Sequence, residues 1–166
     1  MDEIDRSLLA MLQQDATLSI AQMAERIGLS PTPCWKRIQK LEAAGIITRR
    51  VALVDPQRVG VGLSVLVSIE AGEHTPEWLR CFSLGVAALP EVMEVYRMAG
   101  DVDYMLRVAV ADMAEYDSFY KKLIALAPMK NVTSRLAMER IKHTTAYPLH
   151  PSAFRDRRAA EGGAPE

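Results

Sequence analysis

The sequence predicts an α+β chain in two parts, three short helices followed by elements in the order β-α-β-β-α-β. In the first 50 residues, apolar side chains recur at helical spacing between glycine and serine boundaries. After residue 60, β-rich runs alternate with helical runs, and a tail rich in Gly, Pro and Ala closes the chain. We therefore expect a helical domain (1–50), a linker strand (51–60), a mixed domain (61–150) and a disordered tail (151–166).

Three short helices account for the first segment. Ile4, Leu8, Leu9, Met11 and Leu12 form an apolar stripe over residues 2–14. Ser19 is the expected N-cap of a second helix that ends at Gly28, where a glycine tolerates a left-handed backbone. Ser30 is the expected N-cap of the third helix, with Pro31 at its first position and Gly45 after its end. We expect this third helix to bury Cys34, Ile38 and Leu41.

Only Gly28, Leu29 and Ser30 separate the second helix from the third. A short glycine-containing turn between two short helices is typical of a helix-turn-helix, here of the winged-helix kind. Ala24, four residues before Gly28, allows the two helices to cross closely. The first segment is therefore predicted to be a helix-turn-helix domain.

Charge is distributed unevenly along a chain whose formal net charge is only −1. Residues 1–25 carry a net charge of −4 and residues 26–50 a net charge of +5. A local basic segment indicates a polyanionic partner, although a solvated helix face is the simpler alternative. On the third helix the cations lie away from the buried stripe, which suits a helix entering the major groove of DNA. The candidate DNA-binding residues are Ser30, Thr32, Pro33, Lys36, Arg37, Lys40, Arg49 and Arg50.

The second half alternates between strands and helices. We expect strands over 46–54, 63–70, 91–100 and 104–111 and a final extended stretch over 132–148, in which residues 136–141 could instead be helical. Helices are expected within 74–90 and 112–128, the latter with Asp112 as N-cap and Glu115 completing a capping box. This order is that of a ferredoxin-like βαββαβ domain.

One sheet face of such a domain is left without helices. Apolar residues for both faces are expected from Val65, Val67, Ile69, Val95, Val108 and Val110. A dimer formed through the sheet is the simplest way to cover the second face.

Composition excludes several classes of protein. A hydrophobic content of 49% and a charged content of 25% are ordinary for a globular chain, and no apolar run approaches the ~20 residues of a membrane span. The acidic, amphipathic N-terminus does not resemble a signal peptide. The two cysteines, Cys34 and Cys81, are too few for a disulfide framework, so we expect reduced, buried thiols in a cytoplasmic protein.

Catalysis is not expected. The chain has no GxSxG, P-loop or GxGxxG motif, and His74, His143 and His150 lack metal-ligand spacing. Asp101 and Asp103 together would make a thin cation site, so no catalytic or metal-binding residue is assigned. An architectural, effector-independent DNA-organising protein is the alternative, but that class usually carries high overall positive charge.

Several segments are similar to one family. SPTPCWKRIQKLE (30–42) and GDVDYML (100–106) are the most specific of them, with VALVDP and VTSRLAMERIKHTTAYP beside them. On these segments, residues 1 to about 150 resemble the leucine-responsive regulatory protein / asparagine regulator (Lrp/AsnC) family of transcription regulators. RMAGDVDY, VTS and AMERIKHTT are most similar to a branch associated with cysteine-responsive regulators.

The resemblance implies a regulator that binds a double-stranded DNA operator, forms dimers that often assemble into octamers, and uses no cofactor beyond an amino-acid effector. Cysteine, leucine or another small amino acid would bind between dimers near the loop at 100–104. The implied effector-binding residues are Met98, Gly100, Asp101, Asp103, Tyr104, Thr133 and Ser134. Taken alone, the spacing of Asp101 and Asp103 favours a simple hairpin turn, and it is the resemblance that favours an effector site.

Overall fold

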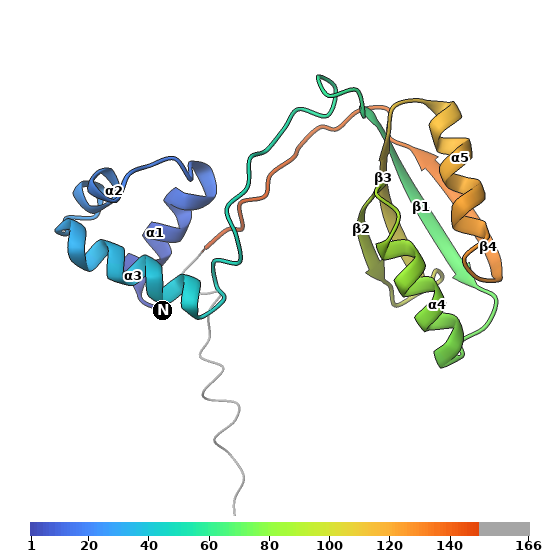
Figure 1. Cartoon of the computed structure of the whole chain (residues 1–166), viewed down its shortest axis with the longest axis horizontal. Helices are drawn as coiled ribbons and strands as arrows, with labels where there is room; N and C mark the ends of the chain where they lie inside the picture. Colours follow the sequence, from blue (N-terminus) through green and yellow to red (C-terminus); the bar gives the residue numbers. More distant parts are fainter. Residues whose placement is uncertain (150–166) are drawn as a thin grey trace, which may run out of the picture. The chain divides into compact units, whose positions relative to one another are not determined.

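The computed structural model describes residues 1–149, which divide into two compact units (Figure 1). Unit 1 comprises residues 1–52 together with 142–149, and unit 2 comprises residues 53–141. The sequence placed residues 142–149 in the second domain, whereas the structure groups them with the N-terminal helices. The predicted disordered tail, 151–166, lies outside the described residues.

Unit 1 contains the three predicted helices, α1 (Glu3–Gln14), α2 (Ile20–Arg26) and α3 (Pro31–Ala43). Ser19 caps α2 in a capping box with Gln22, as its sequence predicts. Ser30 stands at the N-cap of α3, but its side chain makes no capping hydrogen bond. The buried core of the unit consists of Leu8, Met23, Ala24, Cys34 and Ile38.

The turns that end α2 and α3 depend on glycine. Gly28 and Gly45 both have a φ of +67°, a left-handed conformation that most side chains disfavour. After Gly45, the Ile46 N–H donates to the Leu41 carbonyl and closes the end of α3. Both predicted helix ends are therefore confirmed.

The strand expected over 46–54 does not form. Within the described residues, no backbone ladder pairs this stretch, and a strand needs a hydrogen-bonded neighbour to exist. Residues 56–60 form a turn instead, closed by the hydrogen bond from the Val61 N–H to the Pro56 carbonyl. The linker is therefore irregular backbone, and the expectation of a linker strand was wrong.

Unit 2 is a four-stranded antiparallel sheet with two helices on one face (Figure 1). Its strand order is β2-β3-β1-β4, with β1 (Leu63–Ala71), β2 (Val92–Arg97), β3 (Tyr104–Val110) and β4 (Met129–Leu136). The helices are α4 (Pro76–Ala87) and α5 (Met113–Ile124). The predicted βαββαβ domain is confirmed, while residues 137–149 form neither helix nor strand.

The two faces of this sheet differ in chemistry. Val65, Val67, Ile69, Val108 and Val110 are all fully buried, and alternation along β1 and β3 places them together on the helix-covered face. Register sets Val95 opposite Leu106, on that same face.

The open face instead mixes polar groups with a few apolar residues such as Leu66 and Met105. Arg107 forms an ion pair with Glu94, and Arg135 donates to the Ser68 hydroxyl. The expectation that the six apolar residues serve both faces was therefore wrong.

Two helix details also differ from expectation. Cys81 is exposed, because the buried stripe of α4 is Trp78, Phe82 and Val86, and Cys81 lies one residue off that stripe. The Asp112 side chain caps α5 as predicted, but the Glu115 carboxylate accepts from the Ala111 N–H rather than from the N-cap residue.

Candidate functional site

The outer surface of α3 carries most of the predicted DNA-binding residues. Ser30, Thr32, Pro33, Lys36 and Lys40 are exposed. The opposite side of the helix is anchored by the three buried residues Cys34, Ile38 and Leu41, as its sequence predicts. Burial raises the pKa of the Cys34 thiol, so this anchor is a neutral apolar group at ordinary pH. The helix therefore presents an exposed, cationic face from a fixed position in unit 1.

The cations of this surface fall into two groups. Lys36, Lys40 and Arg49 have no hydrogen bond or ion pair within residues 1–149, so no acidic side chain of the described residues neutralises their charges. Arg37 instead pairs with Asp2 and Asp5, at 2.6 and 2.7 Å, and Arg50 pairs with Glu42 at 2.8 Å. Half of the surface of Trp35 is exposed beside these cations.

The predicted effector loop joins β2 to β3. Its base is closed by a hydrogen bond from the Met98 N–H to the Asp103 carbonyl, at 2.8 Å, and the Asp103 N–H donates to the Ile69 carbonyl at 2.9 Å. Gly100 has a φ of +140° with open space where a side chain would stand. The loop therefore brings exposed backbone to the end of the sheet at a position that only glycine adopts readily.

Asp103 has a structural contact in addition to its predicted role. One carboxylate oxygen accepts from the Ala71 N–H at 2.7 Å, and the other lies 3.8 Å from His74 Nε2. About a third of the side chain, 34%, remains exposed. Asp101 is exposed and has no partner among the described residues. The two carboxylates that could receive an ammonium therefore differ in how firmly they are held.

Tyr104 faces away from solvent. Only 7% of the residue is exposed, and its ring lies 4.6 Å from Phe82 and 5.7 Å from Trp78, between ring centroids. The structure thus places this predicted effector contact in the aromatic core of unit 2.

Thr133 and Ser134 point to opposite faces of the sheet, because successive strand residues alternate. Thr133 lies opposite Ser68, on the open face. The Ser134 hydroxyl instead bonds the hydroxyl of Tyr116 on α5. Burial raises the pKa of Tyr116, which stays a neutral hydroxyl in that bond. The structure therefore does not bring Thr133 and Ser134 together in one pocket. Of the two, only Thr133 lies on the open face of the sheet.

Four polar residues near the loop were missed by sequence reasoning. Lys130 and Asn131 donate to the Glu70 carboxylate at 2.8 and 3.1 Å, and the Lys130 hydrogen bond is the main cause that lowers the pKa of Glu70. His74 lies beside Asp103. The charge of Glu70 at the end of the apolar strand β1 was the one available signal, since Lys130 and Asn131 come from a distant segment and His74 lies in the loop after β1.

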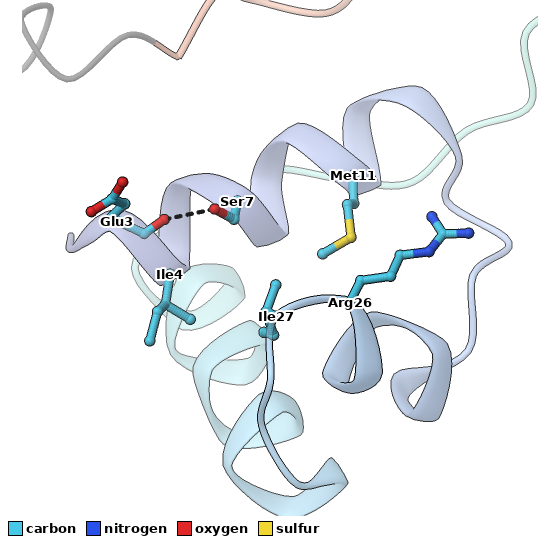
Figure 2. Close-up of a pocket in the computed structure, with 6 residues that line it drawn as sticks. All are labelled: Glu3, Ile4, Ser7, Met11, Arg26 and Ile27. Atoms are coloured by element: carbon cyan, nitrogen blue, oxygen red, sulfur yellow. Dashed lines mark hydrogen bonds between the residues drawn. The ribbon is translucent and has the colours of Figure 1, made fainter.

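A cavity of about 360 Å³ lies in unit 1, between α1 and α2 (Figure 2). It is lined by Glu3, Ile4, Ser7, Met11, Arg26 and Ile27. The Ser7 hydroxyl on its wall is already used, since it donates to the Glu3 carbonyl at 3.0 Å (Figure 2). None of the predicted site residues lines this cavity.

Residues 1–149 contain neither a metal-binding cluster nor a membrane-spanning helix. No cluster of three or more His, Cys, Asp or Glu residues there could hold a metal ion. No helix in that part of the chain is long and apolar enough to cross a bilayer.

These features define a class of protein: a regulator with a helix-turn-helix unit for DNA and a sheet unit for a small ligand. Residues 1–48 match the model for winged helix-turn-helix DNA-binding domains, and residues 64–147 match the model for the Lrp/AsnC ligand binding domain. The chain belongs to the Lrp/AsnC family of transcriptional regulators.

Known relatives agree with this assignment. The DNA-binding transcriptional activator DecR of Escherichia coli K12 is 50% identical over 150 residues, covering 90% of this chain and 99% of that protein. The crystal structure of an AsnC family regulator from Agrobacterium tumefaciens matches with a TM-score of 0.87 and 54% identity, over 90% of this chain and 97% of that one. A Neisseria meningitidis transcriptional regulator solved in complex with L-Met matches with a TM-score of 0.86 and 31% identity, over 90% and 97% of the two chains. The family consists of regulators rather than enzymes.

Proposed function

We propose that this regulator reads its operator with the exposed face of α3 and that a small amino acid bound at the 98–104 loop modulates the reading. The observation that carries the proposal is the uncommitted positive charge of Lys36 and Lys40 on a helix whose opposite side is buried. Thr32 and Pro33 stand at the N-terminal end of that helix, the end that meets base edges in helix-turn-helix proteins. Lys36 and Lys40, one and two turns further on, are placed for phosphates.

Arg49 belongs to the same proposed surface. It follows α3 by a few residues and, like the two lysines, has no partner within residues 1–149. Arg50 is a weaker candidate because it is paired with Glu42, although 43% of its side chain remains exposed. Phosphate contact by Arg50 would require that pair to open or be shared.

The effector proposal rests on complementary charge at one end of the sheet. An amino acid carries an ammonium and a carboxylate, and the loop end offers both kinds of partner. Asp101 and the Asp103 carboxylate oxygen that does not accept from Ala71 are acceptors for the ammonium, and the open backbone at Gly100 is a donor surface for the carboxylate. Thr133 and Met98 border the same region, and cysteine, leucine or another small amino acid would fit this chemistry.

Assembly is part of the proposal. We expect two copies to associate through the open sheet face, where an exposed Leu66 stands among polar groups, and dimers to assemble further into octamers. The operator would then be a pseudo-palindrome with half-sites about one helical turn apart, or a multiple of that spacing.

The DNA proposal is tested by salt titration of operator affinity. A duplex selected by this protein from a random-sequence pool serves as the probe. Each lost phosphate contact makes the negative slope of log K against log salt shallower by about 0.9. Lys36→Ala and Lys40→Ala should each make the slope shallower by about that amount for every copy of α3 engaged. Between 50 and 200 mM salt, each variant should then lose about 3.5-fold less affinity per engaged copy than the parent loses.

Lys121→Ala is the matched control, because Lys121 lies on α5 and pairs with Asp117. This variant should leave the slope unchanged. If both α3 lysine variants keep the parental affinity and slope, α3 is not the reading helix.

A further inference from the structure

Arg37 lies on α3 but is directed at α1. Its Nη1 atom donates to Asp2 Oδ2 at 2.6 Å and to Asp5 Oδ1 at 2.7 Å. About two thirds of the Arg37 side chain is covered, with 32% exposed, and only 14% of the Asp5 side chain is exposed. The one arginine in the middle of the cationic helix is therefore engaged inside unit 1.

Asp2 and Asp5 form the capping box of α1, and each has one oxygen left over. Asp2 Oδ1 accepts from the Asp5 N–H at 2.9 Å, and Asp5 Oδ2 accepts from the Asp2 N–H at 3.1 Å. The second oxygen of each carboxylate accepts from Arg37. All four carboxylate oxygens are thus used, and Arg37 closes the network. Hydrogen bonds from the Asp5 N–H and then from Arg37 lower the pKa of Asp2.

We infer that Arg37 is a positioning residue, which fixes the angle of α3 by tying it to the first turn of α1, rather than a residue that contacts DNA. The inference rests on the proposed reading by α3 and assigns its cations two different tasks. Lys36 and Lys40 supply charge to phosphates, whereas the guanidinium of Arg37 faces two carboxylates that outnumber its single positive charge.

The two possible roles of Arg37 predict opposite effects when its partners are neutralised. If Arg37 contacted phosphate, removing two nearby negative charges would free it and strengthen DNA binding. If Arg37 positions α3, the same change releases the helix and weakens operator binding. The variant Asp2→Asn/Asp5→Asn makes this change and keeps asparagine, a strong N-cap residue, at the start of α1.

The experiment measures affinity for the selected duplex and for a scrambled duplex across a salt series, with the full chain. We expect Arg37→Gln and Asp2→Asn/Asp5→Asn each to lower operator affinity several-fold while the salt slope stays at the parental value. The variant that combines both changes should bind the operator no more weakly than the weaker of the two separate variants, because both changes break one network. Arg37→Lys should restore most of the affinity, since a single ammonium can donate to both carboxylates as Nη1 does.

Loss of folding is distinguished from loss of positioning by the ratio of the two affinities. Partial unfolding lowers binding to both duplexes by the same factor, whereas a misplaced α3 lowers operator binding more than scrambled binding. The inference is overturned if the salt slope of Arg37→Gln is shallower than the parental slope by about 0.9 per engaged α3. It is also overturned if Asp2→Asn/Asp5→Asn binds DNA more tightly than the parent. Equal loss on both duplexes also overturns it. None of these results depends on the outcome for Lys36→Ala and Lys40→Ala, which tests the proposed reading surface itself.

Discussion

Replacing Asp103 tests the effector site, but the replacement must separate loss of effector binding from loss of stability. The Asp103 carboxylate accepts from the Ala71 N–H at 2.7 Å, and Ala71 is buried, with 6% of its surface exposed. Asp103→Ala would leave that N–H without a partner and cost about 1–3 kcal/mol of stability. Asp103→Asn keeps an acceptor oxygen for Ala71 and replaces the other oxygen by an NH2 group, which removes the negative charge that would receive an ammonium. The asparagine variant therefore isolates the effector role.

The expected loss follows from the strength of a hydrogen bond to a charged group. An ammonium bound to a carboxylate contributes about 1.5–3 kcal/mol, which corresponds to an effector dissociation constant roughly 10 to 150 times larger in Asp103→Asn. Isothermal titration with the amino acid that gives the largest thermal shift among the twenty is the assay. Asp101→Asn is the matched comparison on the same loop. An unchanged effector titration in both variants, with melting temperatures near the parental value, would refute the placement of the site.

Three further predictions concern the two units separately. In the native protein Cys81 should react rapidly with a thiol reagent and the buried Cys34 only on unfolding, so two fast thiols per chain would contradict the assigned burial. Burial raises the pKa of Cys34 above its ordinary value of 9.0, so the unfolded chain releases its thiol proton first. The free energy of unfolding should therefore fall as pH rises above 9.0. Cys34→Ala should remove that contribution in denaturant titrations at different pH values. Gln13 both donates to the Tyr147 carbonyl, at 3.3 Å, and accepts from its N–H, at 2.7 Å, so Gln13→Ala should speed amide exchange at Tyr147 while exchange in unit 2 stays unchanged.

Local patterns were enough to predict the helices and the exposed cationic face of α3. The periodicity of α3 separates Cys34, Ile38 and Leu41 from the exposed cations, so both faces follow from spacing along one helix. The glycine turns at Gly28 and Gly45 are equally local, because a positive φ is a property of the residue itself. The βαββαβ order follows from the alternation of strand and helix patterns.

Pairing between distant segments could not be predicted in this way. Arg37 and Asp2 are 35 residues apart, and only the packing of α1 against α3 brings them together. The linker over 46–54 has a strand-like sequence but no partner strand among the described residues, so propensity did not decide its structure. By contrast, the opposite directions of Thr133 and Ser134 follow from strand alternation, once β4 is known to include both residues.

The most direct test of the central claim is the ratio of affinities for the selected and scrambled duplexes at one fixed salt concentration, measured with and without the amino acid that stabilises the protein most. An effector-modulated, sequence-specific regulator should favour the selected duplex by at least about a thousandfold. At a concentration near the parental dissociation constant, the amino acid should change that ratio in the parent and change it far less in Asp103→Asn. A ratio near one that does not respond to any amino acid would instead indicate an architectural DNA-organising protein and contradict the account.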